Sequence, residues 1–134
     1  MTAALDWRTL AAILMGGGIG SVLRYAVTLL VTQRVGAGYS WVATMLINVT
    51  GSFVIGAVFA LAQTRALGIS PLMRMFLMTG VLGGYTTFST FSLDMVTLVS
   101  DGALPLGLLY ASGSVLLGFL AAFAGVVAAR ALQP

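Results

Sequence analysis

Residues 83–92 read Gly-Gly-Tyr-Thr-Thr-Phe-Ser-Thr-Phe-Ser and lie within a stretch that otherwise has the composition of a membrane helix. Glycine and the hydroxyl residues are poor helix formers. In hydrocarbon, every backbone N–H and C=O needs a partner within the protein, so irregular backbone occurs only where it is buried in protein or lines a polar cavity. The stretch therefore predicts a helix that is interrupted at Gly83 and Gly84, with freed carbonyl groups and a functional site beside the interruption.

The rest of the composition is that of an integral membrane protein. The chain has 134 residues, of which 60% are hydrophobic and 7% are charged. An apolar helix of roughly 20 residues crosses a bilayer. The sequence predicts an all-α membrane protein with a single domain, residues 1–134, built as a four-helix subunit with spans at residues 9–32, 41–62, 71–100 and 104–132. The third stretch is longer than a span requires, as expected for a helix that stops and resumes.

The charged residues bear on topology rather than on nucleic-acid binding. The six arginines are scattered singly near helix ends instead of forming a basic patch. Four spans place both termini on one side, which Arg8, Arg65, Arg74 and Arg130 would flank, against Arg34 on the other side. The positive-inside rule then favours cytoplasmic termini. The bias is modest, and it leaves insertion in both orientations open.

The residue types present do not support ordinary catalysis. The chain has no His, Cys, Lys or Glu, and its three Asp residues are far apart in sequence. General acid–base and nucleophilic catalysis both need such groups placed together. We therefore expect no enzyme. The available groups are hydroxyl, amide and guanidinium donors, backbone carbonyls near the interruption and aromatic rings, and these suit the binding of ions.

Two phenylalanines follow the predicted interruption by one helical turn. Phe88 and Phe91 are three residues apart and so share a helix face. Aromatic rings have a negative face and a positive edge, so rings presented edge-on suit a small anion. The freed carbonyls of a broken helix suit a hard cation instead. From the residues alone, both signs of ion remain open.

Polar residues on the other predicted helices could face the same site. Arg24 lies near the boundary of the hydrocarbon, where it could be an interfacial anchor or a functional cation. Asn48 is near the middle of its helix, where an amide is more often an interhelical contact than a ligand group. Tyr110 and Ser114 share one face of the last helix, and this polar stripe could face a vestibule or simply pack. Asp94 follows Phe91 on the same face.

Glycines in the first helix predict close helix packing. Gly16 with Gly20, and Gly17 with Ser21, have the small-xxx-small spacing that lets helix backbones approach each other. No strand precedes them and no Lys-Ser or Lys-Thr pair follows, which argues against a phosphate-binding loop. A four-helix chain of this size buries little surface, so we also expect oligomerisation.

Together these motifs resemble a known family. The elements are the glycine stretch from Gly16 followed by Arg24, then Asn48 with Gly51, then the run GGYTTFSTF at residues 83–91. In order and spacing they are similar to the Fluc (CrcB-type) fluoride channels over all four predicted helices. The resemblance implies a fluoride-specific channel in the inner cell membrane, an antiparallel dimer of four-helix subunits with two pores. Fluoride enters cells as the neutral weak acid and is trapped as the anion, so a passive exit pathway lowers cytoplasmic fluoride.

The resemblance also implies roles for individual residues. Phe88 and Phe91 match the paired phenylalanines that line the pores, and Asn48 matches a pore-facing donor. Gly83 and Thr86 match positions whose carbonyls, taken from both subunits, hold a structural sodium ion that is not transported. Arg24 matches the arginine near the vestibule. Further positions match polar residues along the anion path, namely Thr44, Ser89, Thr90, Tyr110 and Ser114.

Several alternatives remain at this stage. Asp94 stands where relatives usually carry Glu, so the role of that carboxylate is open. The partner subunit could be an identical chain or an inverted homologous chain. A small dual-topology multidrug exporter has a similar size, but it needs a membrane carboxylate that exchanges protons and cations, usually a Glu in the first helix, and here only Asp94 qualifies. A non-conducting assembly subunit would use the glycines and hydroxyls purely for packing.

Overall fold

The computed structural model describes residues 6–63 and 69–132, and within these ranges the chain folds almost entirely into helices. Arg65, which belongs to the predicted charge bias, lies outside the described residues. The helices in chain order are α1 (Trp7–Val35), the 3₁₀-helix η1 (Ala37–Tyr39), α2 (Ser40–Gln63), α3 (Pro71–Arg74), the π-helix η3 (Met75–Leu82), α4 (Gly83–Tyr85), α5 (Phe88–Ser100) and α6 (Leu104–Ala131).

Within residues 6–63 and 69–132, three helical stretches are long and apolar enough to cross a membrane. They are Trp7–Val35, Ala37–Gln63 and Leu104–Ala131. Helices α1, α2 and α6 have 29, 24 and 28 residues, or about 36 to 44 Å at a rise of 1.5 Å per residue, which exceeds the ~30 Å of a hydrocarbon core. The prediction of a helical, multi-pass membrane protein is confirmed.

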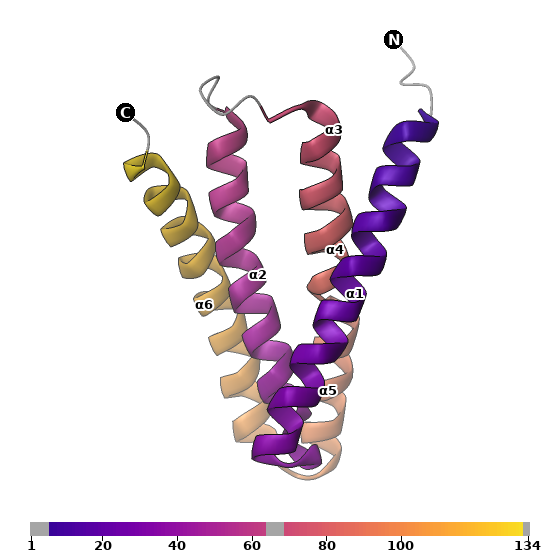
Figure 1. Ribbon diagram of the computed structural model, residues 1–134. Helices are drawn as coiled ribbons and strands as arrows, with labels where there is room; N and C mark the ends of the chain where they lie inside the picture. The colour runs from indigo at the N-terminus through magenta and orange to yellow at the C-terminus, as the bar shows by residue number, and fades with distance from the viewer. Residues whose placement is uncertain (1–5, 64–68, 133–134) are drawn as a thin grey trace.

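The helices lie side by side, with the start of α1 and the end of α6 at one end (Figure 1). The C-terminal end of α2 and the short helix α3 lie at this same end, whereas η1 and the turn between α5 and α6 lie at the other. Helix α6 packs along α2, and α1 packs along η3 and α4. The segments α3, η3, α4 and α5 follow one another along one direction as an interrupted helix. The interruption between α4 and α5 lies between α1 and α2.

Glycines allow the two main helix pairs to approach closely. A Cβ atom added at Gly16 would lie 2.6 Å from the Phe76 carbonyl oxygen and 3.0 Å from the Gly80 Cα atom, so α1 and η3 are in backbone contact. Between α2 and α6, a Cβ atom at Gly56 would lie 2.9 Å from the Ala122 carbonyl carbon. A Cβ atom added at Gly20 would collide with the carbonyl group of Val81 in η3. The predicted packing role of the glycines in the first helix is therefore confirmed for Gly16 and Gly20. Close backbone approach is the usual way in which membrane helices gain van der Waals contact.

Polar side chains cap the N-terminal ends of α1 and α3. Asp6 caps α1 by accepting from the backbone N–H groups of Arg8 and Thr9, each at 3.3 Å. The N–H of Arg8 also holds the pKa of the Asp6 carboxyl below its usual value. Ser70 caps α3 by accepting from the N–H of Met73 at 3.1 Å. These caps satisfy N–H groups that have no partner within a helix.

The helix is interrupted later than the sequence predicts. Gly83 has helical angles, φ −64° and ψ −36°, and Gly84 lies in α4. The extended residues are Thr86, with φ −78° and ψ 159°, and Thr87, with φ −153° and ψ 121°. The predicted break at Gly83 and Gly84 is therefore wrong by about three residues. Gly84 serves close packing instead, since an added Cβ atom would lie 3.0 Å from the Cα atom of Gly17 in α1.

Candidate functional site

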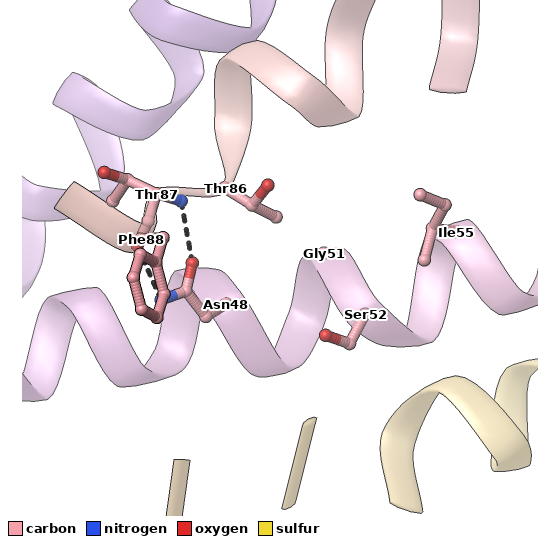
Figure 2. A pocket seen from close by; sticks show the side chains of 7 residues that line it. All are labelled: Asn48, Gly51, Ser52, Ile55, Thr86, Thr87 and Phe88. Carbon is pink, nitrogen blue, oxygen red and sulfur yellow. Dashed lines mark hydrogen bonds between the residues drawn. The ribbon is translucent and has the colours of Figure 1, made fainter. Parts of the chain in front are cut away.

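The interruption is held by the side chain of Asn48 on α2. The Asn48 Oδ1 atom accepts from the Thr87 N–H at 2.8 Å, and the Asn48 Nδ2 atom donates to the Thr87 carbonyl at 3.0 Å. Figure 2 shows the amide facing the extended segment. An asparagine amide has two N–H hydrogens, so one remains after this pair is made. Asn48 thus replaces the hydrogen bonds that a continuous helix would have given Thr87.

Thr87 in turn begins helix α5. Its Oγ1 atom accepts from the Thr90 N–H at 3.2 Å and donates to the Thr90 Oγ1 atom at 3.0 Å. In a continuous α-helix the N–H groups of Thr87 and Thr90 would bond to the carbonyls of Gly83 and Thr86. Here side-chain oxygens bind both N–H groups. The carbonyls of Gly83 and Thr86 are therefore released from their usual helical donors.

An open cavity of about 310 Å³ lies beside the interruption. Figure 2 shows its lining on α2 and on the extended segment. Phe88, the first residue of α5, is 79% exposed. The residues that line it are Asn48, Gly51, Ser52, Ile55, Thr86, Thr87 and Phe88.

Aromatic rings form a row that leads away from the interruption. The ring centroids of Phe88 and Phe91 are 5.6 Å apart, and those of Phe91 and Tyr110 are 5.1 Å apart. Trp41 meets Tyr110 edge to face, with centroids 5.6 Å apart. The rings of Phe88 and Phe91 therefore lie side by side, as expected from their spacing, and Tyr110 of α6 extends the row.

Asp94 is buried at the end of this row. It is only 8% exposed. Its Oδ2 atom accepts from the Tyr110 hydroxyl, and its Oδ1 atom accepts from the Ser40 hydroxyl, each at 3.3 Å. The expectation that Asp94 shares the face of Phe91 is confirmed. Both carboxylate oxygens are thus used to fix Tyr110 and the start of α2.

A second cavity, of about 470 Å³, joins α1 to this region. Arg24 lines it together with Thr44, Thr90 and Asp94. Arg24 is partly buried, and within residues 6–63 and 69–132 it forms no ion pair. An unpaired guanidinium in a polar cavity attracts anions. The structure therefore brings Arg24, Thr44 and Thr90 to one cavity, as the sequence interpretation requires.

The remaining predicted hydroxyls have different surroundings. Ser114 is 9% exposed, and its Oγ atom is buried without a hydrogen-bond partner among the described residues. Ser89 is exposed, and its Oγ atom lies 3.3 Å from the Thr87 Oγ1 atom. By contrast, Ser112, on the same helix as Ser114, donates to the Leu108 carbonyl of its own helix at 2.8 Å. Of these three hydroxyls, only that of Ser114 is buried without a partner among the described residues.

Comparison with known proteins identifies the family. The family described as CrcB-like protein, camphor resistance (CrcB), matches residues 11–126. The chain belongs to the CrcB family. This match reaches from α1 into α6 and confirms the resemblance found in the sequence.

Three relatives in this family each carry the name fluoride-specific ion channel FluC. The protein of Rhizobium meliloti is 51% identical over 117 residues, which cover 87% of this chain and 92% of the relative. That of Agrobacterium fabrum is 45% identical and covers 92% of this chain and 97% of the relative. That of Thermus thermophilus is 45% identical and covers 83% of this chain and 86% of the relative.

Sequence reasoning missed three parts of the site. Thr87 holds the interruption through both its backbone and its side chain, and a Thr before a helical run is a helix-capping signal that could have been recognised. Ser40 binds Asp94 from 54 residues away, and no local pattern predicts such a contact. Tyr85 binds Thr50, with 3.0 Å between their hydroxyl oxygens, which likewise needs the packed helices to be seen.

Proposed function

We propose that the chain is a subunit of a fluoride-specific channel that lets fluoride leave the cytoplasm passively. The observation that carries the proposal is the Phe88–Phe91 pair, with centroids 5.6 Å apart directly after the interruption, in a chain 51% identical to a protein named as such a channel. Ring edges that point into a pathway offer positive partial charge to a small anion. The proposal describes a channel and not an enzyme.

Donors along the two cavities would replace part of the hydration shell of fluoride. An anion that leaves water loses strong hydrogen bonds, and the cost is several kcal/mol or more. Arg24 would attract the anion to the larger cavity. The second N–H of Asn48, in the smaller cavity, would then donate to it. The unpartnered Ser114 hydroxyl, which lies outside the lining of both cavities, would donate farther along the proposed path. Thr44, Ser89, Thr90 and Tyr110 complete the proposed path.

The working unit is proposed to be an antiparallel dimer in the inner cell membrane, made with an identical chain or an inverted homologous one. The stretch from Pro71 to Ser100 would be the fourth span, which makes residues 1–134 one four-helix subunit. Polar backbone does not face lipid, yet Gly83 is exposed, Thr86 is partly exposed, and the cavity beside Thr86 is open. A second subunit would cover this face. The membrane side of each terminus would then differ between the two subunits.

We further propose that a structural sodium ion binds at the carbonyls of Gly83 and Thr86, taken from both subunits. Within the described residues no cluster of His, Cys, Asp or Glu could hold a metal ion. The two carbonyls fit a hard cation, which prefers oxygen ligands, because their helical N–H donors are bound elsewhere. The ion would supply a fixed positive charge between the subunits. It would not be transported.

The test measures fluoride efflux from liposomes that hold the purified protein, for the wild type, Phe88→Ile and Phe91→Ile. We expect both substitutions to reduce efflux by more than about tenfold, since isoleucine keeps the apolar volume but has no positive ring edge. Phe123→Ile is the matched control, because Phe123 is 61% exposed on α6 and far along the chain from the row. The proposal would be refuted if fluoride efflux were unchanged in both Phe88→Ile and Phe91→Ile, or if the wild type released chloride as fast as fluoride.

A further inference from the structure

Helix α2 contacts three consecutive residues at the interruption. The Thr50 Oγ1 atom lies 3.0 Å from the Tyr85 Oη atom. Gly51 leaves the space into which Thr86 fits, because an added Cβ atom would collide with the Thr86 methyl group and lie 3.3 Å from the Tyr85 ring. Asn48 binds Thr87. The residues on both sides of Thr86 are therefore tied to α2.

The direction of the Thr50–Tyr85 hydrogen bond follows from the geometry around Thr50. The Thr50 Oγ1 atom is 2.7 Å from the Leu46 carbonyl oxygen of its own helix. A threonine hydroxyl has one hydrogen, and a carbonyl can only accept, so this hydrogen is directed to Leu46. Tyr85 is then the donor, and Thr50 Oγ1 is the acceptor. The result is a directed chain from the Tyr85 hydroxyl through Thr50 to the Leu46 carbonyl.

Tyr85 is well placed to affect the released carbonyls. It is the last residue of α4, two residues after Gly83 and directly before Thr86. Helix α4 has only three residues, and the extended residues that follow it give no helical restraint. The Thr86 N–H is bonded to the Leu82 carbonyl at 3.0 Å, but this bond alone does not fix the orientation of the next carbonyls.

We propose that Thr50 and Tyr85 are positioning residues that, through their hydrogen bond, orient the carbonyls of Gly83 and Thr86 for cation binding. The inference rests on the proposed function, because the cation site belongs to it. The Asn48–Thr87 pair fixes one side of Thr86, and the Thr50–Tyr85 pair fixes the other. A cation held by carbonyl oxygens is sensitive to such restraint, since its affinity depends on ligands already in place.

The test measures sodium binding through the thermal stability of the purified full-length protein. The unfolding temperature is recorded against NaCl concentration, with N-methylglucamine chloride keeping the ionic strength constant. The unfolding temperature rises with the logarithm of the sodium concentration once that concentration exceeds the dissociation constant, so a fit of this dependence gives an apparent sodium affinity. The variants are Tyr85→Phe, Thr50→Val and the double variant, with Thr50→Ser as the conservative replacement. Tyr39→Phe and Thr97→Val are matched controls, in η1 and α5.

We expect each single variant to weaken the apparent sodium affinity by about two- to tenfold, the range of one net hydrogen bond. The double variant is expected to lose no more than the worse single variant, because both changes remove the same bond. Thr50→Ser should restore the affinity of the wild type, and the two controls should match it. A purely structural bond would lower the unfolding temperature equally at every sodium concentration and leave the affinity unchanged.

Three outcomes would overturn the inference, and they can be distinguished. If sodium stabilises the wild type and both single variants with equal affinity, Thr50 and Tyr85 do not position the site, while the proposed channel and its cation site stand. If the single losses add in the double variant, the residues do not act through a shared bond. If NaCl does not stabilise the wild type, the proposed sodium site fails with the inference, and fluoride efflux then reports separately on the channel.

Discussion

Replacing Asn48 with leucine removes the two hydrogen bonds that hold the interruption. The bonds join the Asn48 side chain to the N–H and the carbonyl of Thr87 at 2.8 and 3.0 Å. Interhelical hydrogen bonds in membrane proteins contribute about 0.6 kcal/mol on average and up to about 1.7 kcal/mol. Two such bonds therefore contribute about 1–3 kcal/mol.

The loss has a second part, because Thr87 stays buried. Thr87 is 8% exposed, so its N–H would lose its partner without gaining water. An unsatisfied buried donor costs about 1–3 kcal/mol. We therefore expect Asn48→Leu to lower the free energy of unfolding by about 2–6 kcal/mol in total, a large fraction of the stability of a typical protein.

The free energy of unfolding is measured in mixed micelles titrated with a denaturing detergent. Ser52→Ala is the matched control, since Ser52 lines the same cavity on the same helix and forms no hydrogen bond through its side chain in the described part of the chain. The control should change stability by less than about 0.5 kcal/mol. A loss in Asn48→Leu that is as small as in the control would show that Asn48 does not hold the interruption.

Two further predictions separate packing from ion conduction. Gly56→Ala should destabilise the protein by about 1–3 kcal/mol, the usual cost of overpacking, because the added Cβ atom would collide with α6. Gly113→Ala is the control and should be tolerated, since its Cβ atom would lie 3.6 Å from the Met45 side chain. Detergent unfolding of the two variants decides this, and equal stabilities would contradict the packing argument. Ser114→Ala should leave stability within about 0.5 kcal/mol of the wild type, because its hydroxyl has no partner to lose among the described residues, yet it should slow fluoride efflux. Ser112→Ala should change neither quantity, and a fall in stability without slower efflux in Ser114→Ala would assign Ser114 to packing.

The long apolar helices could be predicted from the sequence because their signal is local. Helices α1, α2 and α6 begin and end within three residues of the expected positions. Runs of apolar residues of this length have few alternatives in a membrane protein. The same reasoning identified residues 71–100 as one longer helical stretch with an interruption.

The position of the interruption could not be predicted by propensity alone. Gly83 and Gly84 are the poorest helix formers in the stretch, yet both are helical. At Gly84 the absence of a side chain lets α1 pack closely, since an added Cβ atom would lie 3.0 Å from the Gly17 Cα atom. The chain is extended at Thr87, where Asn48 of another helix supplies the lost hydrogen bonds. Tertiary contacts thus override local preference.

The candidate site was predicted in its residue types but not in its contacts. Phe88 and Phe91 were predictable because three-residue spacing places them together on a helix. The bonds of Asp94 to Ser40 and Tyr110 span 54 and 16 residues, and they depend on how α2, α5 and α6 pack. Such contacts between helices leave no period in the sequence.

The most direct test of the central claim is the ion selectivity of the wild-type protein in liposomes. Purified protein is reconstituted, and the initial rates of fluoride and chloride efflux are measured with ion-selective electrodes under the same gradient. A fluoride channel predicts rapid fluoride efflux and chloride efflux no faster than from protein-free liposomes. Equal efflux of the two anions, or fluoride efflux at the protein-free rate, would contradict it.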